Sequence, residues 1–286
     1  MNMTFKEHSW TCEDGTAMYG CAWQPPAGIP AKAVVGLVHG MGEHMGRYGH
    51  VADWLTRDGY AVIGFDQRGH GRTAGKRGHT PTYEALFEGI DLLLAEAAAS
   101  YPGLPVFLIA HSMGGNVTLN YLLRKQPRIA GAVVSGPWLK LAFRPPSLQV
   151  AIGRVIERIY PSYTNDRPLK AAVLTSDPEM IARYVNDSLG HGRITAKFFL
   201  SMLRSGRWAI EHASLLTVPT LVLHATEDKV TSSAASKQFA EAAGSVCEWI
   251  GWDGFQHELY NELRREEVFA VMRDWLSRRL AEWSAR

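Results

Sequence analysis

The chain has 286 residues, of which 46% are hydrophobic, with 30 Lys and Arg against 28 Asp and Glu. A chain of this length and composition can bury a sizeable core, so a disordered or fibrous protein is excluded, and one large domain with an inserted element fits the length. The formal charge of +2, with no dense Lys/Arg run, argues against nucleic acid as a partner.

The N-terminus and the cysteines bear on the compartment. The opening sequence MNMTFKEHSW has no apolar core of signal-peptide length, and no later stretch approaches the ~18 apolar residues of a membrane span. A hairpin with Glu13 opposite Thr16 would pair Cys12 with Ala17 rather than with Cys21, so no disulfide is expected. An odd cysteine count without C-x-x-C spacing favours reduced thiols. These features predict a cytoplasmic protein.

Short β-rich runs alternate with helical patterns along most of the chain. Residues 4–10 and 16–23 are expected to form an edge hairpin around the turn Asp14-Gly15. Six further runs are expected as strands: Ala33–His39, Tyr60–Phe65, Pro105–Ala110, Gly131–Ser135, Pro219–Ala225 and Ser245–Ile250. This alternation predicts an α/β fold, with a mostly parallel sheet covered by helices on both faces.

Two of the predicted helices have well-defined apolar faces. The first follows Thr80 and Pro81, which are placed as N-cap and first-turn residues, and repeats apolar residues at helical spacing: Tyr83, Leu86, Phe87, Ile90, Leu93, Leu94 and Ala97. The second is the last helix, with the apolar positions Val268, Met272, Trp275 and Leu276.

An insertion interrupts the alternation between the strand ending near Ser135 and the strand starting near Pro219. Its roughly eighty residues show helical patterns but no strand. One predicted helix carries an apolar stripe: Leu148, Ile152, Val155, Ile156 and Ile159.

The segment His111-Ser112-Met113-Gly114-Gly115 lies between the predicted strand Pro105–Ala110 and a predicted helix. This order is typical of a nucleophile elbow, in which a tight strand-to-helix turn projects the serine hydroxyl above the sheet. Ala110 stands where the strict G-x-S-x-G pattern has glycine, and alanine is small enough for that place. The alternative is that Ser112 only caps a helix.

Two residues are candidates for supplying the backbone N–H groups that would bind a tetrahedral oxyanion. One is Met113, directly after the serine. The other is Met41, in the glycine-flanked sequence His39-Gly40-Met41-Gly42-Glu43-His44 after the strand Ala33–His39. That segment could also be an ordinary Gly-rich loop. A metal site at His39, Glu43 and His44 is disfavoured, because the order is not H-E-x-x-H and no cysteine is nearby.

The acid and the base of a catalytic triad should follow the serine in that order. His257 is the one histidine C-terminal to His224, and it lies in a loop before the last helix. Asp228 follows the preceding strand and is our candidate acid, with Glu227 and Asp253 as competitors. Acyl transfer by such a triad requires neither a cofactor nor a metal.

Four segments together resemble the monoglyceride lipase and lysophospholipase group of capped α/β-hydrolases, over essentially the whole chain. They are 39–44 with Arg47-Tyr48, the sequence Phe65-Asp66-Gln67-Arg68-Gly69-His70-Gly71, the serine segment, and Gly254-Phe255-Gln256-His257-Glu258. The resemblance implies a hydrolase core of residues 1–136 and 213–286 and a helical cap of residues 137–212 that covers the site and forms a tunnel for an acyl chain. It also implies that Glu43 and Arg47, beside Gly40, lie near the polar end of the substrate.

The expected activity is hydrolysis of carboxylic esters through an acyl-enzyme, with a monoacylglycerol or a lysophospholipid as substrate. A short-chain carboxylesterase or polyester-oligomer hydrolase is the alternative, and a non-catalytic binding protein of the same fold is a third. The stripe, above all Leu148, Ile152 and Ile156, is a candidate for the tunnel wall; it could instead touch a membrane surface or form the packing core of the cap. The oligomeric state is left open.

Overall fold

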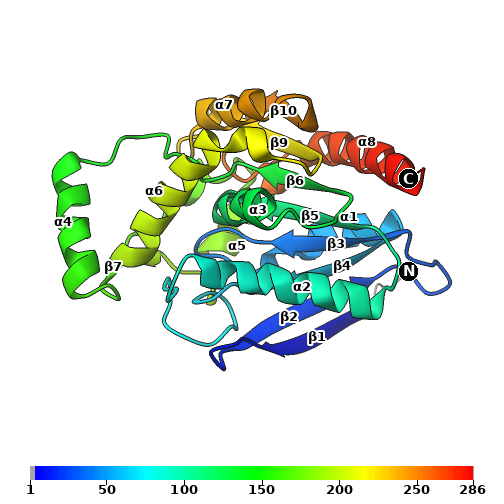
Figure 1. Cartoon of the computed structure of the whole chain (residues 1–286), viewed down its shortest axis with the longest axis horizontal. Coiled ribbons are helices and arrows are strands. Elements are labelled where there is room, and N and C mark those ends of the chain that lie inside the picture. The colour runs from blue at the N-terminus through cyan, green and yellow to red at the C-terminus, as the bar shows by residue number, and fades with distance from the viewer. Residues whose placement is uncertain (1–3, 286) are drawn as a thin grey trace.

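The computed structural model describes residues 4–285 as an eight-stranded sheet covered by helices (Figure 1). The first three residues of the N-terminal sequence discussed above lie outside this range. The strand order is β1-β2-β4-β3-β5-β6-β9-β10, with the strands Thr4–Thr11 (β1), Ala17–Gln24 (β2), Ala33–Val38 (β3), Tyr60–Phe65 (β4), Val106–His111 (β5), Gly131–Ser135 (β6), Thr220–Ala225 (β9) and Cys247–Trp252 (β10).

The pairing from β4 to β10 is parallel throughout, and only the β1–β2 ribbon joins antiparallel at one edge. The predicted mostly parallel sheet is therefore confirmed. The last strand begins two residues later than expected, because the short 3₁₀ turn Gly244–Val246 precedes it.

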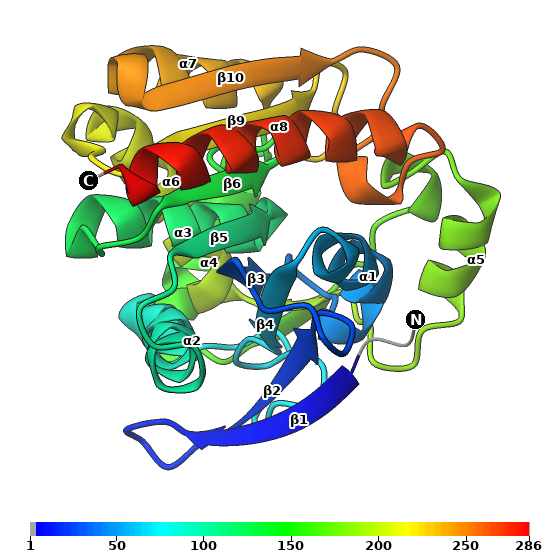
Figure 2. The same ribbon diagram turned by 90° about the vertical axis from the view of Figure 1, so that its right-hand side faces the viewer.

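Helices cover both faces of the sheet, as Figure 2 shows from the side of α1 and α8. Alternate residues of β3 explain why: Val34 and Val38 pack into a core shared with α2 and α3, whereas Val35 and Leu37 pack into a core shared with α1 and α8. The α-helices are Gly49–Arg57 (α1), Phe87–Ser100 (α2), Ser112–Lys125 (α3), Ser147–Ile159 (α4), Pro178–Val185 (α5), Ala196–Glu211 (α6), Ser233–Ala243 (α7) and Arg265–Ser284 (α8).

Short 3₁₀ helices complete the described secondary structure: Met45–Tyr48 (η1), Glu84–Leu86 (η2), Ala171–Val173 (η3), Ala213–Leu215 (η4), Gly244–Val246 (η5) and Leu259–Asn261 (η6). The helix predicted from Thr80 starts later than expected, as η2 followed by α2. At the start of this helix the N–H of Ala85 donates to Thr82 Oγ1 at 3.1 Å, so Thr82 rather than Thr80 accepts from the first turn. The predicted apolar face of the last helix is buried in α8 as expected.

The N-terminal hairpin has a different register from the one we predicted. Thr11 lies opposite Ala17, and Cys12 N–H donates to Thr16 O at 3.0 Å, so the strands are displaced by one residue. The turn is longer by one residue, with Gly15 at φ +79° as its left-handed position. Cys12, Cys21 and Cys247 are all free and buried.

The inserted segment between β6 and β9 contains α4, α5 and α6, and also a small antiparallel ribbon that the sequence did not predict. Its strands are Thr164–Asp166 (β7) and Arg193–Thr195 (β8). Strands of three residues are too short to show a period of two, which explains why they were missed. Helix α4 stands apart from the sheet at the left of Figure 1, contacts α6, and has no fully buried residue. Among the described helices, none combines the length and apolarity needed to cross a bilayer.

Candidate active site

The turn at Ser112 joins β5 directly to α3, and it is strained. Ser112 has φ +53°, and of the described non-glycine residues only Gln126 also has a positive φ. A non-glycine residue is held in this conformation only when its surroundings enforce it. The strain, the position after a parallel strand and the start of a helix are those of a nucleophile elbow.

Close packing explains which residues flank the elbow. A Cβ built on Gly114 would overlap the carbonyl oxygens of Val38 and His39, so no larger residue fits where α3 crosses the end of β3. On the strand side, the alanine at position 110 is accommodated and fully buried. The fold therefore accommodates the departure from the strict glycine pattern within its packed core.

Three loops at the carboxyl edge of the sheet bring together the residues predicted for a triad. His257 Nε2 lies 2.9 Å from Ser112 Oγ, and His257 Nδ1 lies 2.6 Å from Asp228 Oδ2. The competitor Asp253 accepts instead from Thr226 Oγ1 in an exposed loop, and Glu227 points to solvent. Of the candidate acids, Asp228 is the one that meets the imidazole.

Burial and charge oppose each other in this hydrogen-bonded chain. Burial alone would lower the pKa of His257, but the carboxylates of Asp228, Glu258 and Glu43 outweigh it, so the pKa is raised. Burial likewise disfavours ionised Asp228, yet the charge of His257 and hydrogen bonds from His224 and His257 hold the pKa of Asp228 far below its usual range. Asp228 therefore stays ionised while His257 can take and release a proton.

The loop after β3 passes directly beside the serine. A Cβ on Gly40 would lie 3.2 Å from Ser112 Cβ, and both Gly40 and Met41 line the same cavity as Ser112. Met113 N–H belongs to the first turn of α3, whose N–H groups have no carbonyl partner within the helix. Both predicted donors thus belong to segments that lie next to Ser112.

The three side chains considered for a metal site bond to different partners. His39 Nε2 accepts from Gln67 N at 2.8 Å, and His44 Nε2 contacts Asp187 at 2.9 Å. Glu43 accepts from the backbone N–H of Gly40. Within residues 4–285, no group of three or more His, Cys, Asp or Glu side chains is arranged to hold a metal ion.

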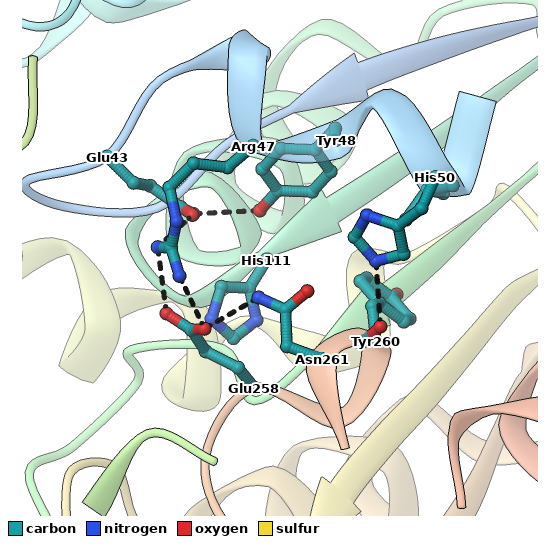
Figure 3. Close-up of a pocket in the computed structure, with 9 residues that line it drawn as sticks. Glu43, Arg47, Tyr48, His50, His111, Glu258, Tyr260 and Asn261 are labelled. Atoms are coloured by element: carbon teal, nitrogen blue, oxygen red, sulfur yellow. Dashed lines mark hydrogen bonds and ion pairs between the residues drawn. The ribbon is translucent and has the colours of Figure 1, made fainter. Parts of the chain in front are cut away.

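Glu43 and Arg47 form a buried ion network that holds this loop (Figure 3). Arg47 makes two hydrogen bonds to Glu258, at 3.0 and 2.8 Å, and a third to Glu43 at 2.9 Å. Tyr48 OH donates to Glu43 at 2.7 Å. Glu43 and Arg47 also border a large cavity that reaches Ser112. Their charged groups are nevertheless paired within the protein, which makes the network a link between the Gly40 loop and the residue after His257.

A cavity of about 500 Å³ extends from Ser112 and His257 into the inserted segment. Its lining is mainly apolar and includes Trp138, Leu141, Phe143, Ile152, Ile156, Leu174, Ile194, Phe199 and Leu200. A concave, largely apolar cavity with a few convergent polar groups is the usual form of a small-ligand site.

The comparisons with known proteins agree with this geometry. The model of the family described as serine aminopeptidase, S33 (Hydrolase_4), matches residues 29–264. The chain belongs to this family. The predicted α/β-hydrolase fold is confirmed, and so is the resemblance to the monoglyceride lipase group.

Named relatives of this hydrolase include lipases. A monoacylglycerol lipase from Mycolicibacterium smegmatis is 30% identical over 278 residues, 96% of this chain and 98% of the relative. Phospholipase YtpA from Bacillus subtilis is 31% identical over 254 residues, 88% and 97% of the two chains. The crystal structure of the Paleococcus ferrophilus monoacylglycerol lipase has a TM-score of 0.83 at 31% identity, covering 92% of this chain and 99% of that one.

A longer abhydrolase domain-containing protein from Dictyostelium discoideum also matches, and the hydrolase spans 27% of its length. Taken together, the relatives confirm the prediction of a carboxylic ester hydrolase.

The apolar stripe of α4 only partly faces the cavity of this hydrolase. Ile152 and Ile156 line it, as predicted from the apolar stripe. Leu148 does not belong to the lining, and 70% of its surface is exposed. The expectation that Leu148 helps to form a tunnel wall is not met, because the stripe is wider than the face that α4 turns toward α6.

Several lining residues were missed from the sequence. Phe199 and Leu200 of α6 face the cavity opposite α4, and Leu174 and Ile194 come from the stretches around α5. The apolar run Phe198-Phe199-Leu200 was a usable signal, since in a helix only part of such a run can face its own core. Nothing local marked Leu174, which is placed by the hydrogen bond from Glu258 N–H to its carbonyl at 2.7 Å.

Proposed function

We propose that this hydrolase cleaves esters of single-chain lipids, with monoacylglycerols as the preferred substrates, through an acyl-enzyme on Ser112. One observation carries the proposal: the hydrogen-bonded chain from Ser112 through His257 to Asp228 borders an apolar cavity of about 500 Å³. That volume lies in the range of sites that enclose drug-sized or lipid-sized ligands.

In the proposed reaction His257 removes the proton of Ser112, and the Ser112 oxygen attacks the ester carbonyl carbon. The N–H groups of Met41 and Met113 stabilise the oxyanion. His257 then gives its proton to the leaving alcohol, and the acyl-enzyme remains. Water repeats the sequence on the acyl-enzyme and releases the carboxylic acid. Asp228 orients the imidazole and stabilises its charged form throughout.

The inserted segment, residues 137–212, is proposed to act as a cap on a core of residues 1–136 and 213–286. The apolar lining contributed by Ile152, Ile156 and Phe199 supports a binding place for the acyl chain. Gly40, which leaves space beside Ser112, and the Glu43–Arg47 pair support a more polar end for the head group. The M. smegmatis relative named monoacylglycerol lipase and the B. subtilis relative named phospholipase make glycerol and a lysophospholipid head group the two choices.

Transient contact of the cap with a membrane surface belongs to the same proposal. The outer face of α4 presents Leu148, Val155 and Ile159, of which 70, 56 and 79% is exposed. Exposed apolar side chains on an amphipathic helix with basic residues beside them favour the interfacial region of a bilayer. We place the protein in the cytoplasm, where a monoacylglycerol would reach it from the membrane surface.

A panel of esters tests the proposed substrate class. We expect the highest kcat/KM for a monoacylglycerol of medium or long chain, with lysophosphatidylcholine, C2 to C4 esters, polyester oligomers and an aminoacyl anilide all cleaved more slowly. A maximum at C2 to C4, or with the polyester oligomers, would instead make the protein the alternative esterase. Faster cleavage of the anilide than of any ester would favour a peptidase, and cleavage of none would favour a binding protein.

A further inference from the structure

The carboxylate of Asp228 has a second histidine partner that the proposed reaction does not use. His224 Nε2 lies 3.1 Å from Asp228 Oδ2, the same oxygen that His257 Nδ1 contacts at 2.6 Å. The side chains of His224 and Asp228 are completely shielded from solvent. His224 is the last residue but one of β9, so it comes from the rigid sheet rather than from a loop.

The partners of the His224 ring fix its orientation. An ionised carboxylate only accepts hydrogen bonds, so His224 carries a hydrogen on Nε2. Its Nδ1 lies 2.8 Å from Ser236 Oγ on α7, and that hydroxyl can donate to an unprotonated ring nitrogen. The carbonyl of Thr231, at 3.3 Å from Nε2, is the more distant acceptor. Both ring nitrogens are therefore paired when Nε2 donates to Asp228.

The other side-chain donor near Asp228 Oδ2 is divided between two acceptors. Thr231 Oγ1 lies 3.0 Å from Asp228 Oδ2 and 3.1 Å from the carbonyl of Gly136, and a hydroxyl has a single hydrogen to donate. The second carboxylate oxygen accepts from the backbone N–H groups of Val230 and Thr231, at 2.6 and 3.1 Å. His224 is thus the second side chain beside Thr231 that can donate to the oxygen shared with His257, and its Nε2–H has Asp228 as its nearer acceptor.

We propose that His224 is a positioning residue for the reaction, acting through the Asp228 oxygen that it shares with His257. It keeps Oδ2 in line with His257 Nδ1, and its hydrogen bond withdraws part of the negative charge that the imidazolium feels. The inference rests on the proposed function, because a positioning role requires that Asp228 and His257 take part in the reaction. His224 itself is assigned no contact with the substrate. Its role differs from a purely structural one in that it sets the basicity of His257.

Other titratable groups also surround His257 and remain in place when His224 is changed. They are Glu258 on the same loop, Glu43 after β3, Arg47 on η1 and His111 at the end of β5, whose ring centroid is 4.8 Å from that of His257. Removing the His224 donor leaves Asp228 more negative at Oδ2. The protonated form of His257 is then favoured, so the acid limb of the kcat/KM profile moves to higher pH.

Two amide substitutions separate the two contacts of His224. In His224→Gln the amide reaches the place of Nε2 and can still donate to Asp228. In His224→Asn the amide reaches only the place of Nδ1, so the contact with Ser236 is kept and the one with Asp228 is lost. We expect His224→Asn to lower kcat about fivefold, the effect of one lost hydrogen bond of average strength, with KM unchanged.

The acid limb of the kcat/KM profile of His224→Asn should move up by about half a pH unit. The reason is that Asp228 without this hydrogen bond is more negative and raises the pKa of His257. His224→Gln should recover most of kcat and the wild-type limb. Equal kcat and equal pH profiles for both variants and the wild type would overturn the inference. So would equal losses of kcat in both variants that follow their thermal melting temperatures, because that pattern is one of structure alone.

Ser112→Ala and Asp228→Asn, measured in the same assay, separate this inference from the proposed function. Normal turnover by Ser112→Ala would refute the proposed function itself. If Ser112→Ala and Asp228→Asn are both inactive while His224→Asn behaves as the wild type, the proposed function survives and the positioning role of His224 is wrong.

Discussion

Tryptophan at position 152 should shorten the acyl chain that the hydrolase prefers. Ile152 lies on the face of α4 that borders the cavity, and half of its surface is exposed. The indole ring of Ile152→Trp takes up space that the far end of an acyl chain would otherwise fill. The catalytic candidates are on the core loops, so a short ester should still reach Ser112.

The expected size of the effect follows from the burial of methylene groups. Each buried CH₂ contributes ~0.8 kcal/mol, which is about fourfold in kcat/KM. If the indole excludes two or three methylenes, kcat/KM for C12 to C16 esters should fall roughly 15- to 60-fold while that for C4 esters changes little.

The assay compares kcat/KM for C4 to C16 esters in Ile152→Trp and in Leu148→Trp. The second variant is the matched control, because Leu148 is on the same helix but outside the cavity lining. Thermal melts check that both variants fold. If long and short esters lose the same factor in Ile152→Trp, or if Leu148→Trp shifts the preference equally, then α4 does not measure chain length and the cavity binds the acyl chain elsewhere.

Three further outcomes follow from the site. Asp228→Asn should lower kcat by ~10⁴-fold, whereas Asp253→Asn should change it by no more than about twofold; the reverse ranking in steady-state kinetics would exchange their roles. Because its neighbouring carboxylates raise the pKa of His257, kcat/KM should be lost as pH falls, with a midpoint above ~6.5, and a flat profile from pH 5 to 8 would argue against this base. Gly114→Ala places a methyl group against carbonyl oxygens at the end of β3 and should destabilise the fold by ~1–3 kcal/mol. A thermal melt measures this loss, and an unchanged melting temperature would contradict it.

The sheet and the Ser112–His257–Asp228 arrangement could be predicted because their signals are local or topological. Each strand is an apolar run with β-rich composition, and the carboxyl ends of parallel strands meet at one edge. A serine after β5 and an acid after β9 must therefore approach a histidine after β10, although 145 residues separate Ser112 from His257. The one-residue register error at Cys12 shows the limit of this reasoning, since the turn length was not encoded by Asp14-Gly15 alone.

Other features depend on which face of an element meets which neighbour, and periodicity does not contain that information. The stripe on α4 was recognised, but the sequence did not show that Ile152 faces a cavity while Leu148 faces outward. The pairing of Arg47 with Glu258, across 211 residues, could likewise not be seen in the sequence. His224 was noted only as a histidine N-terminal to His257, because its contact with Asp228 depends on the bend of the chain after β9.

The most direct measurement of the central proposal is intact-mass and peptide mass spectrometry after treatment with a fluorophosphonate. A serine activated by His257 in an open cavity should take one label per chain, on Ser112, and monoacylglycerol should slow the labelling. Ser112→Ala should neither be labelled nor hydrolyse esters, while its thermal melt stays close to that of the wild type. Ester hydrolysis at the normal rate by Ser112→Ala, or by wild-type protein in which Ser112 stays unlabelled at full exposure to the reagent, would contradict the proposed acyl-enzyme.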